Sequence, residues 1–335
     1  MTDTVLTKTQ GGVGYITLNR PEALHALNLG MCETILAALR VWALDPSIHL
    51  VMIAHTEGPR GFCAGGDLAM LRESGMAIKA FPKPYLAIME GETKGGGVGL
   101  SVHGSHRVAT ERTLFAMPET GIGLFPDVGG GWFLPRLQGE LGTWLALTGD
   151  RLKGADVAAA RVAPHFLPFE LVPNLKAQIG EADFSSGAAE MLGEILSRVT
   201  HAVPVGRFEP NLQTIDTCFA HDRAEDIVAA LEADGSDWAL KQVETIRTKS
   251  PETVKVALRQ VREGGACETF EDNMRMEYRI GWRKVQSPDF IEGVRAVIID
   301  KDHAPKWAPD TLEEVSEAHI AQYFAPLGED ELSFG

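Results

Sequence analysis

The sequence predicts an α/β protein in which short strands with intervening helices come first and a mostly helical region follows. Two observations carry this prediction. In the first half, short apolar and β-branched runs are followed several times by glycine-rich turns and then by helical patterns. From about residue 149 onward, apolar residues recur mainly at helical spacing. We therefore expect a core over residues 1–150 to 200 and a helical C-terminal region over about 200–335.

Local signals predict the elements of the first half. The runs 4–9 and 13–18 flank two glycines and indicate a hairpin. Apolar residues at helical spacing predict a helix over 31–44, which Asp45-Pro46 ends. Further strands are expected at 49–54, 85–89, 107–110 and 114–117, and further helices at 67–80, 98–104 and 132–147.

The second half is predicted to be helical. The clearest helix start is Ser250-Pro251, because serine is a favoured N-cap and proline fits the first helical position. The helix over 268–282 is amphipathic and charged, and we expect its charged side chains to face solvent. The helices expected here are 174–200, 223–233, 236–248, 250–263, 268–282 and 287–300.

Composition and charge argue against several classes of protein. The net charge of −15 disfavours nucleic-acid binding, which needs a basic face. No apolar run approaches the length of a membrane span, so no membrane partner is expected. The N-terminus MTDTVLTKTQ lacks the marks of a signal or transit peptide, and we therefore expect a cytoplasmic protein. The four cysteines have no metal-ligand spacing and favour reduced thiols: Cys32, Cys63, Cys218 and Cys267.

Two glycine-rich stretches predict a site for a developing negative charge. One is GPRGFCAGGDL at 58–68, after an apolar strand; the other contains Gly95-Gly96-Gly97, before a short apolar helix. Glycines leave backbone N–H groups accessible, and two such turns can present one N–H each to the same carbonyl oxygen. The carboxylates Glu119 and Asp127 follow, before a second triplet at 129–131. A donor pocket with nearby carboxylates is what acyl chemistry needs.

These motifs carry a resemblance. FCAGGD, KPYLAIMEGETKGGGVGLSVHGSHRVAT and FAMPETGIGLFPDVGG resemble the crotonase (enoyl-CoA hydratase/isomerase) superfamily, and within it the 3-hydroxyisobutyryl-CoA hydrolase branch. The resemblance extends from about Val13 to Trp307. It implies a crotonase-like spiral of ββα units, with two sheets packed against each other and helices outside. It also implies hydrolysis of an acyl-CoA thioester in valine catabolism.

The resemblance assigns roles residue by residue. The backbone N–H groups of Gly66 and Gly96 would form the oxyanion hole, and Glu119 would be the acid-base carboxylate. Asp127 matches a residue of the hydrolase branch and would position water or the substrate hydroxyl. Two routes stay open at this point, because Glu119 can activate water or attack the thioester directly.

Further expectations concern ligands and assembly. By resemblance, the CoA moiety would be held by His25, Ala26, Leu27, Cys63, Ala64, Gly65 and Lys301. For Lys301 a solvated side chain is an equal alternative, and His25 could be an ordinary loop residue. CoA would enter as part of the substrate, with no metal or redox cofactor. Members of the superfamily often form trimers or pairs of trimers, so a homo-oligomer is a further expectation.

Two departures from the superfamily bear on the reaction. Hydratases carry a second Glu just after the glycine triplet, whereas this chain has Gly99 there. The related hydrolases have more residues between the GGD turn and the KPY strand, with a further substrate-contacting Glu, but here only 68–82 separate them. An isomerase or hydratase-family enzyme with one catalytic carboxylate, and a catalytically silent CoA-binding protein, are the alternatives to the hydrolase.

Overall fold

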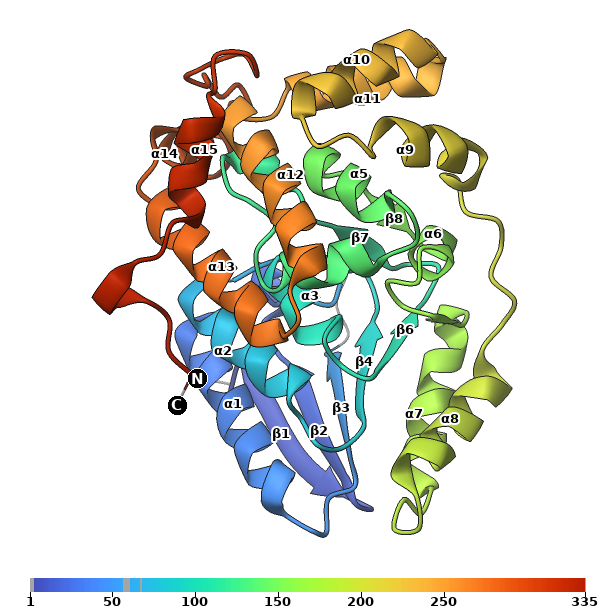
Figure 1. The fold of residues 1–335 in the computed structure, drawn as a ribbon. Coiled ribbons are helices and arrows are strands. Elements are labelled where there is room, and N and C mark those ends of the chain that lie inside the picture. The colour runs from blue at the N-terminus through green and yellow to red at the C-terminus, as the bar shows by residue number, and fades with distance from the viewer. Residues whose placement is uncertain (1–2, 57–60, 67, 335) are drawn as a thin grey trace. The chain divides into compact units, whose positions relative to one another are not determined.

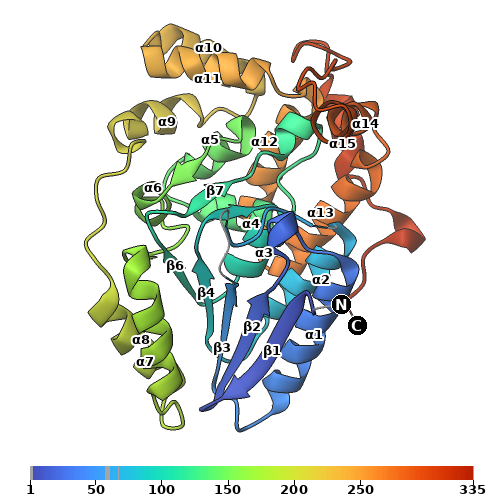
Figure 2. The ribbon, with the colours of Figure 1, turned by 180° about the vertical axis from the view of Figure 1, so that it is seen from behind.

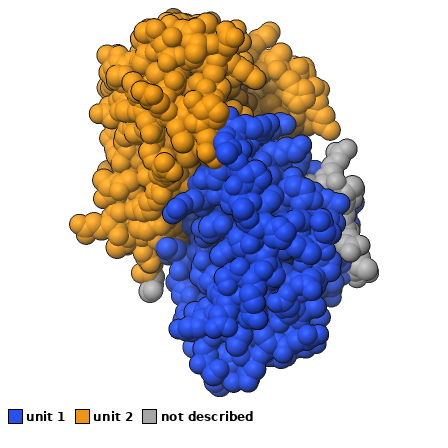
Figure 3. Space-filling view, turned by 90° about the vertical axis from the view of Figure 1, so that its right-hand side faces the viewer, with its two compact units in different colours: residues 1–116, 151–207 blue, residues 117–150, 208–335 orange. Residues whose placement is uncertain are grey.

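The computed structural model describes residues 3–56, 61–66 and 68–334. The chain forms two compact units, which are coloured separately in Figure 3. Unit 1 comprises residues 1–116 and 151–207, and unit 2 comprises residues 117–150 and 208–335. Neither unit is continuous in sequence. The predicted division near residues 150 to 200 concerned the order of elements along the chain, and it stays a prediction.

The strands of the described residues lie in unit 1 and form two sheets. The larger sheet has six strands in the order β1-β2-β3-β4-β6-β9, and the smaller has the order β5-β7-β8. In the larger sheet β1 and β2 form the predicted antiparallel hairpin, and the remaining neighbours are parallel. The strands are β1 (Val5–Gln10), β2 (Val13–Leu18), β3 (Leu50–His55), β4 (Tyr85–Met89), β5 (Glu92–Lys94), β6 (His106–Ala109), β7 (Leu114–Ala116), β8 (Leu152–Lys153) and β9 (His165–Phe166).

The large sheet is covered by helices of unit 1. Leu50, Met52 and Ala54 of β3 alternate along the strand, so they share a face, and this face packs against α7 and α8. Helices α1 and α2 lie in front of the sheet in Figure 1 and behind it in Figure 2. The helices of unit 1 are η1 (Pro21–Ala23), α1 (Leu29–Leu44), α2 (Leu68–Lys79), α3 (Gly96–Ser101), α6 (Ala155–Ala159), η4 (Phe169–Leu171), α7 (Val172–Glu181) and α8 (Ala188–Val199).

Unit 2 is helical and is built around α12, most of whose residues are buried. The α12 helix starts as predicted, because the Ser250 hydroxyl accepts the Thr253 N–H at 3.1 Å. It packs against α4, α5, α13 and α15. The helices of unit 2 are η2 (Glu119–Ile122), α4 (Gly130–Phe133), η3 (Leu134–Arg136), α5 (Leu141–Thr148), η5 (Glu209–Asn211), α9 (Leu212–Cys218), α10 (Ala224–Asp234), α11 (Asp237–Arg247), α12 (Pro251–Ala266), α13 (Phe270–Lys284), α14 (Pro288–Val294), the π-helical turn η6 (Arg295–Ile299), α15 (Glu317–Phe324) and η7 (Gly328–Asp330).

The structure confirms the predicted fold class and corrects several elements. The helix expected over 132–147 is divided into α4, η3 and α5, because Pro135 cannot donate a backbone hydrogen bond and Gly139 adopts a left-handed conformation. The helix expected over 174–200 is two helices, α7 and α8. Strand β5 and helix α9 were not predicted. None of the helices formed by the described residues is both long and apolar enough to cross a membrane.

Candidate active site

Two glycine-rich turns of unit 1 run side by side. The Cys63 N–H donates to the Glu92 carbonyl oxygen at 2.9 Å, and the Lys94 N–H donates to the Cys63 carbonyl oxygen at 3.0 Å. Strand β5 leads from this pairing directly into the turn that carries Gly96. The structure therefore brings the two predicted turns together. Residues 57–60 and 67 of the first turn lie outside the described residues.

Close backbone approach explains the glycines at two positions. A Cβ atom added to Gly97 would lie 2.3 Å from the Cys63 carbonyl oxygen. A Cβ atom added to Gly66 would lie 2.7 Å from the Leu27 Cβ atom. Both distances are shorter than real side chains tolerate, so either substitution would push the turns apart.

The N–H groups of Gly66 and Gly96 are the predicted oxyanion donors. Among the described residues, neither donates to a backbone acceptor. Gly96 is the first residue of α3, where N–H groups have no partner within the helix. Two unpaired N–H groups on neighbouring turns can stabilise negative charge on a substrate oxygen. Their role as an oxyanion hole stays a prediction.

The segment predicted to hold CoA, 25–27, lies against the first turn. The Leu27 N–H donates to the Gly65 carbonyl oxygen at 2.9 Å, and the Ala64 N–H donates to the Leu24 carbonyl oxygen at 3.1 Å. The structure therefore brings Leu27 together with Ala64 and Gly65 within unit 1. Ala26, which precedes Leu27, is half-buried.

The His25 side chain is buried inside the fold and only 1% exposed. Its Nδ1 atom accepts the Arg20 backbone N–H at 3.0 Å, and its ring lies 5.1 Å from the His55 ring between centroids. Burial, followed by the nearby His55, lowers the pKa of His25 to about 4, so the ring is neutral near neutral pH. A ligand at this segment would thus meet its backbone and not this imidazole.

Two other predicted CoA contacts have contrasting surroundings. The Cys63 thiol is fully buried, and burial raises its pKa to about 12, which agrees with a packed thiol and not a nucleophile. Lys301 lies in unit 2, just after η6, where its side chain is exposed and its backbone is left-handed with φ of 57°. CoA binding by these two residues stays a prediction.

The carboxylates Glu119 and Asp127 lie in unit 2 and are both buried. Burial and then the charge of Asp127 raise the pKa of Glu119 well above its usual range. Burial and then the charge of Glu277 raise the pKa of Asp127 to about 8. The Glu119 Oε2 atom is buried without a hydrogen-bond partner among the described residues. Neighbouring buried carboxyls with raised pKa values are suited to general acid-base work.

Glu277, on α13, is a third buried carboxylate beside this pair, and the sequence reasoning missed it. Its Oε2 atom accepts the Gly129 N–H at 2.8 Å, and its Oε1 atom accepts the Gly131 N–H at 2.9 Å. Oε1 also accepts amide N–H groups from Gln260 at 3.2 Å and Asn273 at 3.0 Å.

The expectation that the charged side chains of this helix face solvent is therefore partly wrong, because α13 buries several polar side chains. Asn273, Glu277 and Lys284 are buried together with its apolar residues. Their spacing of four and seven residues places them on one face of a helix, together with Ile280. That spacing was the available signal, but a charged residue on such a face is normally exposed.

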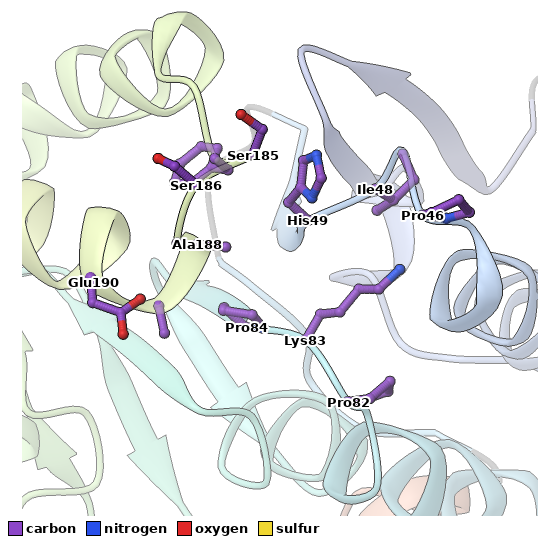
Figure 4. Close-up of a pocket in the computed structure, with 13 residues that line it drawn as sticks. Pro46, Ile48, His49, Pro82, Lys83, Pro84, Ser185, Ser186, Ala188 and Glu190 are labelled. Atoms are coloured by element: carbon purple, nitrogen blue, oxygen red, sulfur yellow. The ribbon is translucent and has the colours of Figure 1, made fainter.

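A cavity of about 450 Å³ in unit 1 is lined by none of the predicted site residues (Figure 4). It is formed by the segments that enter β3 and β4 and by the turn between α7 and α8. In parallel sheets, ligands bind beyond the carboxyl ends of the strands, where the glycine turns lie, and not at these entry ends. The Lys83 ammonium that lines the cavity already donates to the Trp42 and Asp45 carbonyl oxygens at 2.5 and 2.6 Å. Among the described residues, no group of three or more His, Cys, Asp or Glu side chains is arranged to hold a metal ion.

The sequence over residues 13–324 matches the family described as enoyl-CoA hydratase/isomerase. The chain belongs to this family. The mitochondrial 3-hydroxyisobutyryl-CoA hydrolase of Xenopus laevis is 44% identical over 351 positions, covering 98% of this chain and 90% of that protein. The Homo sapiens protein of the same name is 43% identical, with the same coverage. Within the family, the chain belongs to the 3-hydroxyisobutyryl-CoA hydrolase branch, as the resemblance predicted.

A solved structure confirms the crotonase fold. The crystal structure of an enoyl-CoA hydratase from Rhodobacter sphaeroides 2.4.1 matches with a TM-score of 0.89 and 37% identity, covering 99% of this chain and 100% of that chain. Relatives in this family are named for acyl-CoA substrates. The 351 aligned positions exceed the 335 residues of this chain, so the Xenopus laevis protein carries residues without counterparts here.

The expected cytoplasmic location is wrong by these comparisons. The relatives from Xenopus laevis, Rattus norvegicus and Homo sapiens are all named mitochondrial. The physical reason is that compartment is encoded in targeting segments, whereas reduced thiols and an acidic surface are compatible with more than one compartment.

Proposed function

We propose that the protein hydrolyses 3-hydroxyisobutyryl-CoA to 3-hydroxyisobutyrate and CoA, a reaction of valine breakdown. The observation that carries the proposal is the pair of buried carboxyls, Glu119 and Asp127, both with raised pKa values. The substrate is supported by the names of relatives that are 43–44% identical over nearly the whole chain.

The proposed chemistry divides into two tasks. Attack on the thioester carbonyl places negative charge on its oxygen, and the N–H groups of Gly66 and Gly96 would stabilise that charge by ~3 kcal/mol each. Glu119 would supply the basic oxygen, since its Oε2 atom has no partner among the described residues. Asp127 would orient water or the substrate hydroxyl. The CoA moiety would lie against segments 25–27 and 63–65, with Lys301 near a phosphate.

Two routes for Glu119 remain open, and isotope labelling separates them. As a base, Glu119 takes a proton from water, which attacks the thioester and expels the CoA thiolate. As a nucleophile, its carboxylate displaces the thiolate to form an anhydride, which water then cleaves. A single turnover in ¹⁸O-water, with enzyme in excess, should label only the product acid in the first route. Label in the Glu119 side chain, detected by peptide mass, would establish the second.

A thiol-release assay with 3-hydroxyisobutyryl-CoA tests the proposed function. Wild-type protein should release free CoA, and Glu119→Ala should abolish that release. An isomerised or hydrated acyl-CoA without free thiol would instead establish the isomerase or hydratase alternative. CoA binding without any turnover would establish a silent CoA-binding protein. Gly99, where hydratases of the superfamily carry their second carboxylate, favours hydrolysis over hydration.

Cofactor use and assembly are further parts of the proposal. Thioester hydrolysis needs a base, water and oxyanion donors, so we expect unchanged kcat after dialysis against a chelator. A homo-oligomer, a trimer or a pair of trimers, is supported by exposed apolar residues between the last turn of α13 and the end of η6. Sedimentation velocity measures it directly. These residues are Trp282, Val285, Ile291, Ile298 and Ile299.

A further inference from the structure

Glu277 is a buried carboxylate to which the proposed hydrolysis gives no role. It is 4% exposed, and its two oxygens accept four N–H groups. Two of these donors are the backbone amides of Gly129 and Gly131, in the second glycine triplet. Glu277 lies 148 residues after Gly129 in sequence, so only the folded unit 2 brings them together.

The four N–H donors show which protonation state of Glu277 its surroundings stabilise. An ionised carboxylate is purely an acceptor, and each N–H directed at it stabilises the charged form. The Gln260 amide is held in a donating orientation, because its nitrogen also donates to the Pro126 carbonyl oxygen at 2.6 Å. Burial alone would raise the pKa of Glu277, and these hydrogen bonds oppose that effect to leave it at about 7. Glu277 is therefore the member of the cluster that ionises readily.

Asp127 has the opposite surroundings. It lies just before the triplet that Glu277 holds, and the Gly130 N–H donates to the Asp127 carbonyl oxygen at 2.8 Å. Its carboxyl group is buried and within electrostatic reach of Glu277. A second negative charge beside an ionised Glu277 is disfavoured in a dry interior, so the proton remains on Asp127. A neutral Asp127 in turn removes one obstacle to ionisation of Glu119.

We propose that Glu277 is a positioning residue that holds the 129–131 backbone and, by its negative charge, keeps a proton on Asp127. Asp127 then serves hydrolysis as a hydrogen-bond donor while Glu119 is the basic group. The catalytic half of this inference rests on the proposed function. The protonation half, the claim that Glu277 keeps a proton on Asp127, concerns the unliganded protein and does not rest on the proposed function.

The other ionisable groups around this cluster do not reverse the argument. On η3, Arg136 donates to the Trp132 and Gly264 carbonyl oxygens. On α13, Lys284 is paired with Glu252 of α12. Two further ionisable groups lie close to the cluster. The Lys249 ammonium would be 3.7 Å from a Cβ atom on Gly121, and Cys267, which follows α12, is within electrostatic reach of Glu277.

Two substitutions of Glu277 separate the effect of its charge from the effect of its hydrogen bonds to the Gly129 and Gly131 amides. E277Q keeps the length of the side chain and removes its charge, whereas E277D keeps the charge but is one methylene too short to span both glycine amides. In wild type, activity should fall as pH rises past the Asp127 pKa of about 8. E277Q should move this alkaline limb of kcat/KM to lower pH by about one pH unit. E277D should leave the limb in place and lower kcat about tenfold.

The matched control is E271Q, the same substitution at a half-exposed site of α13. It should change neither the alkaline limb of kcat/KM nor kcat. Equal loss of melting temperature in E277Q and E277D with an unmoved alkaline limb would overturn the proposal, because Glu277 would then be merely structural. Unchanged kcat and an unchanged limb in both variants would overturn it as well.

An NMR titration keeps the inference separate from the proposed function. With ¹³C-labelled aspartate carboxyls, the Asp127 signal, assigned by its loss in D127N, should titrate near pH 8 in unliganded wild type and at lower pH in E277Q. If the wild-type protein does not hydrolyse the thioester, the proposed function is wrong. The titration still decides whether Asp127 keeps its proton. An Asp127 signal that titrates near pH 4 in wild type would overturn the protonation half directly.

Discussion

The regions of unit 1 and unit 2 that hold the predicted site residues are built from different groups. In unit 1 they are backbone N–H groups on glycine turns, where the absence of a side chain at Gly66 and Gly97 lets the chain pass within contact distance. In unit 2 the predicted catalytic groups are the buried carboxyls of Glu119 and Asp127, and the backbone that follows Asp127 is held by Glu277 of α13. A neutral N–H group costs little to desolvate compared with a charge. Backbone donors can therefore be positioned by local geometry, whereas buried carboxyls need support from the surrounding fold.

The two regions should consequently respond differently to mutation and pH. The predicted oxyanion donors of the glycine turns are backbone N–H groups, whose charge does not change with pH, so these turns should be sensitive mainly to added side-chain volume. The carboxyl cluster has pKa values near 7 and 8 at Glu277 and Asp127, so its charge changes within the working range.

Glu119→Gln removes the basic group and should lower kcat for thioester hydrolysis by about 10³-fold or more. The free energy of unfolding should not decrease, because the buried Glu119 Oε2 atom has no partner to lose among the described residues. Thiol release and chemical denaturation measure the two quantities. A kcat within tenfold of wild type would show that Glu119 is not the basic group.

Gly97→Ala places a Cβ atom 2.3 Å from the Cys63 carbonyl oxygen and should displace the oxyanion turns. We expect kcat to fall by about 10²-fold, the loss typical of one oxyanion donor, with no change in the pH profile. Gly193→Ala, on α8, is the matched control, since its Cβ atom meets nothing within 4 Å. It should preserve kcat and stabilise the helix by ~0.5–1 kcal/mol. Equal kcat for Gly97→Ala and wild type would show that the turns do not position the donors.

Asp127→Asn should alter the pH dependence of stability. Because the folded pKa of Asp127 is raised to about 8, the folded state holds a proton that the unfolded chain releases near pH 4. Stability from this group is therefore present at low pH and decreases as pH rises from 4 to 8, by at most about 1.4 kcal/mol per pH unit. Urea denaturation across this range should show a smaller decrease in the variant. An unchanged slope would mean that Asp127 ionises normally in the fold.

Lys301→Ala should have the smallest effect. Its side chain is exposed, so a contact with a CoA phosphate would be screened by water and salt. We expect KM for the acyl-CoA to rise about threefold at low salt, with kcat unchanged and the difference vanishing at high salt. Lys241→Ala, another exposed lysine of unit 2, is the control. Identical KM values for the two variants would show that Lys301 is only a solvated side chain.

Local patterns explain why much of the fold was predictable. Some elements carry in their own residues the signal that starts or ends them, and they form where that signal places them. These are the Gly11-Gly12 hairpin, helix α12 with its Ser250 cap, and the buried strand β4. The errors arose where one residue within a good pattern changes the backbone. Pro135 divides one expected helix into three elements, and residues 182–187 separate α7 from α8.

Contiguous motifs were enough to predict the family, the two glycine turns and the identity of the carboxylates, because the local geometry of such motifs is encoded in neighbouring residues. The hydrogen bonds from the Gly129 and Gly131 N–H groups to Glu277, and the burial of the His25 ring, could be seen only in the folded chain. The reason is physical: a carboxyl group's protonation depends on burial and on neighbouring charges, and those neighbours are supplied by residues that sequence separates and folding brings into contact.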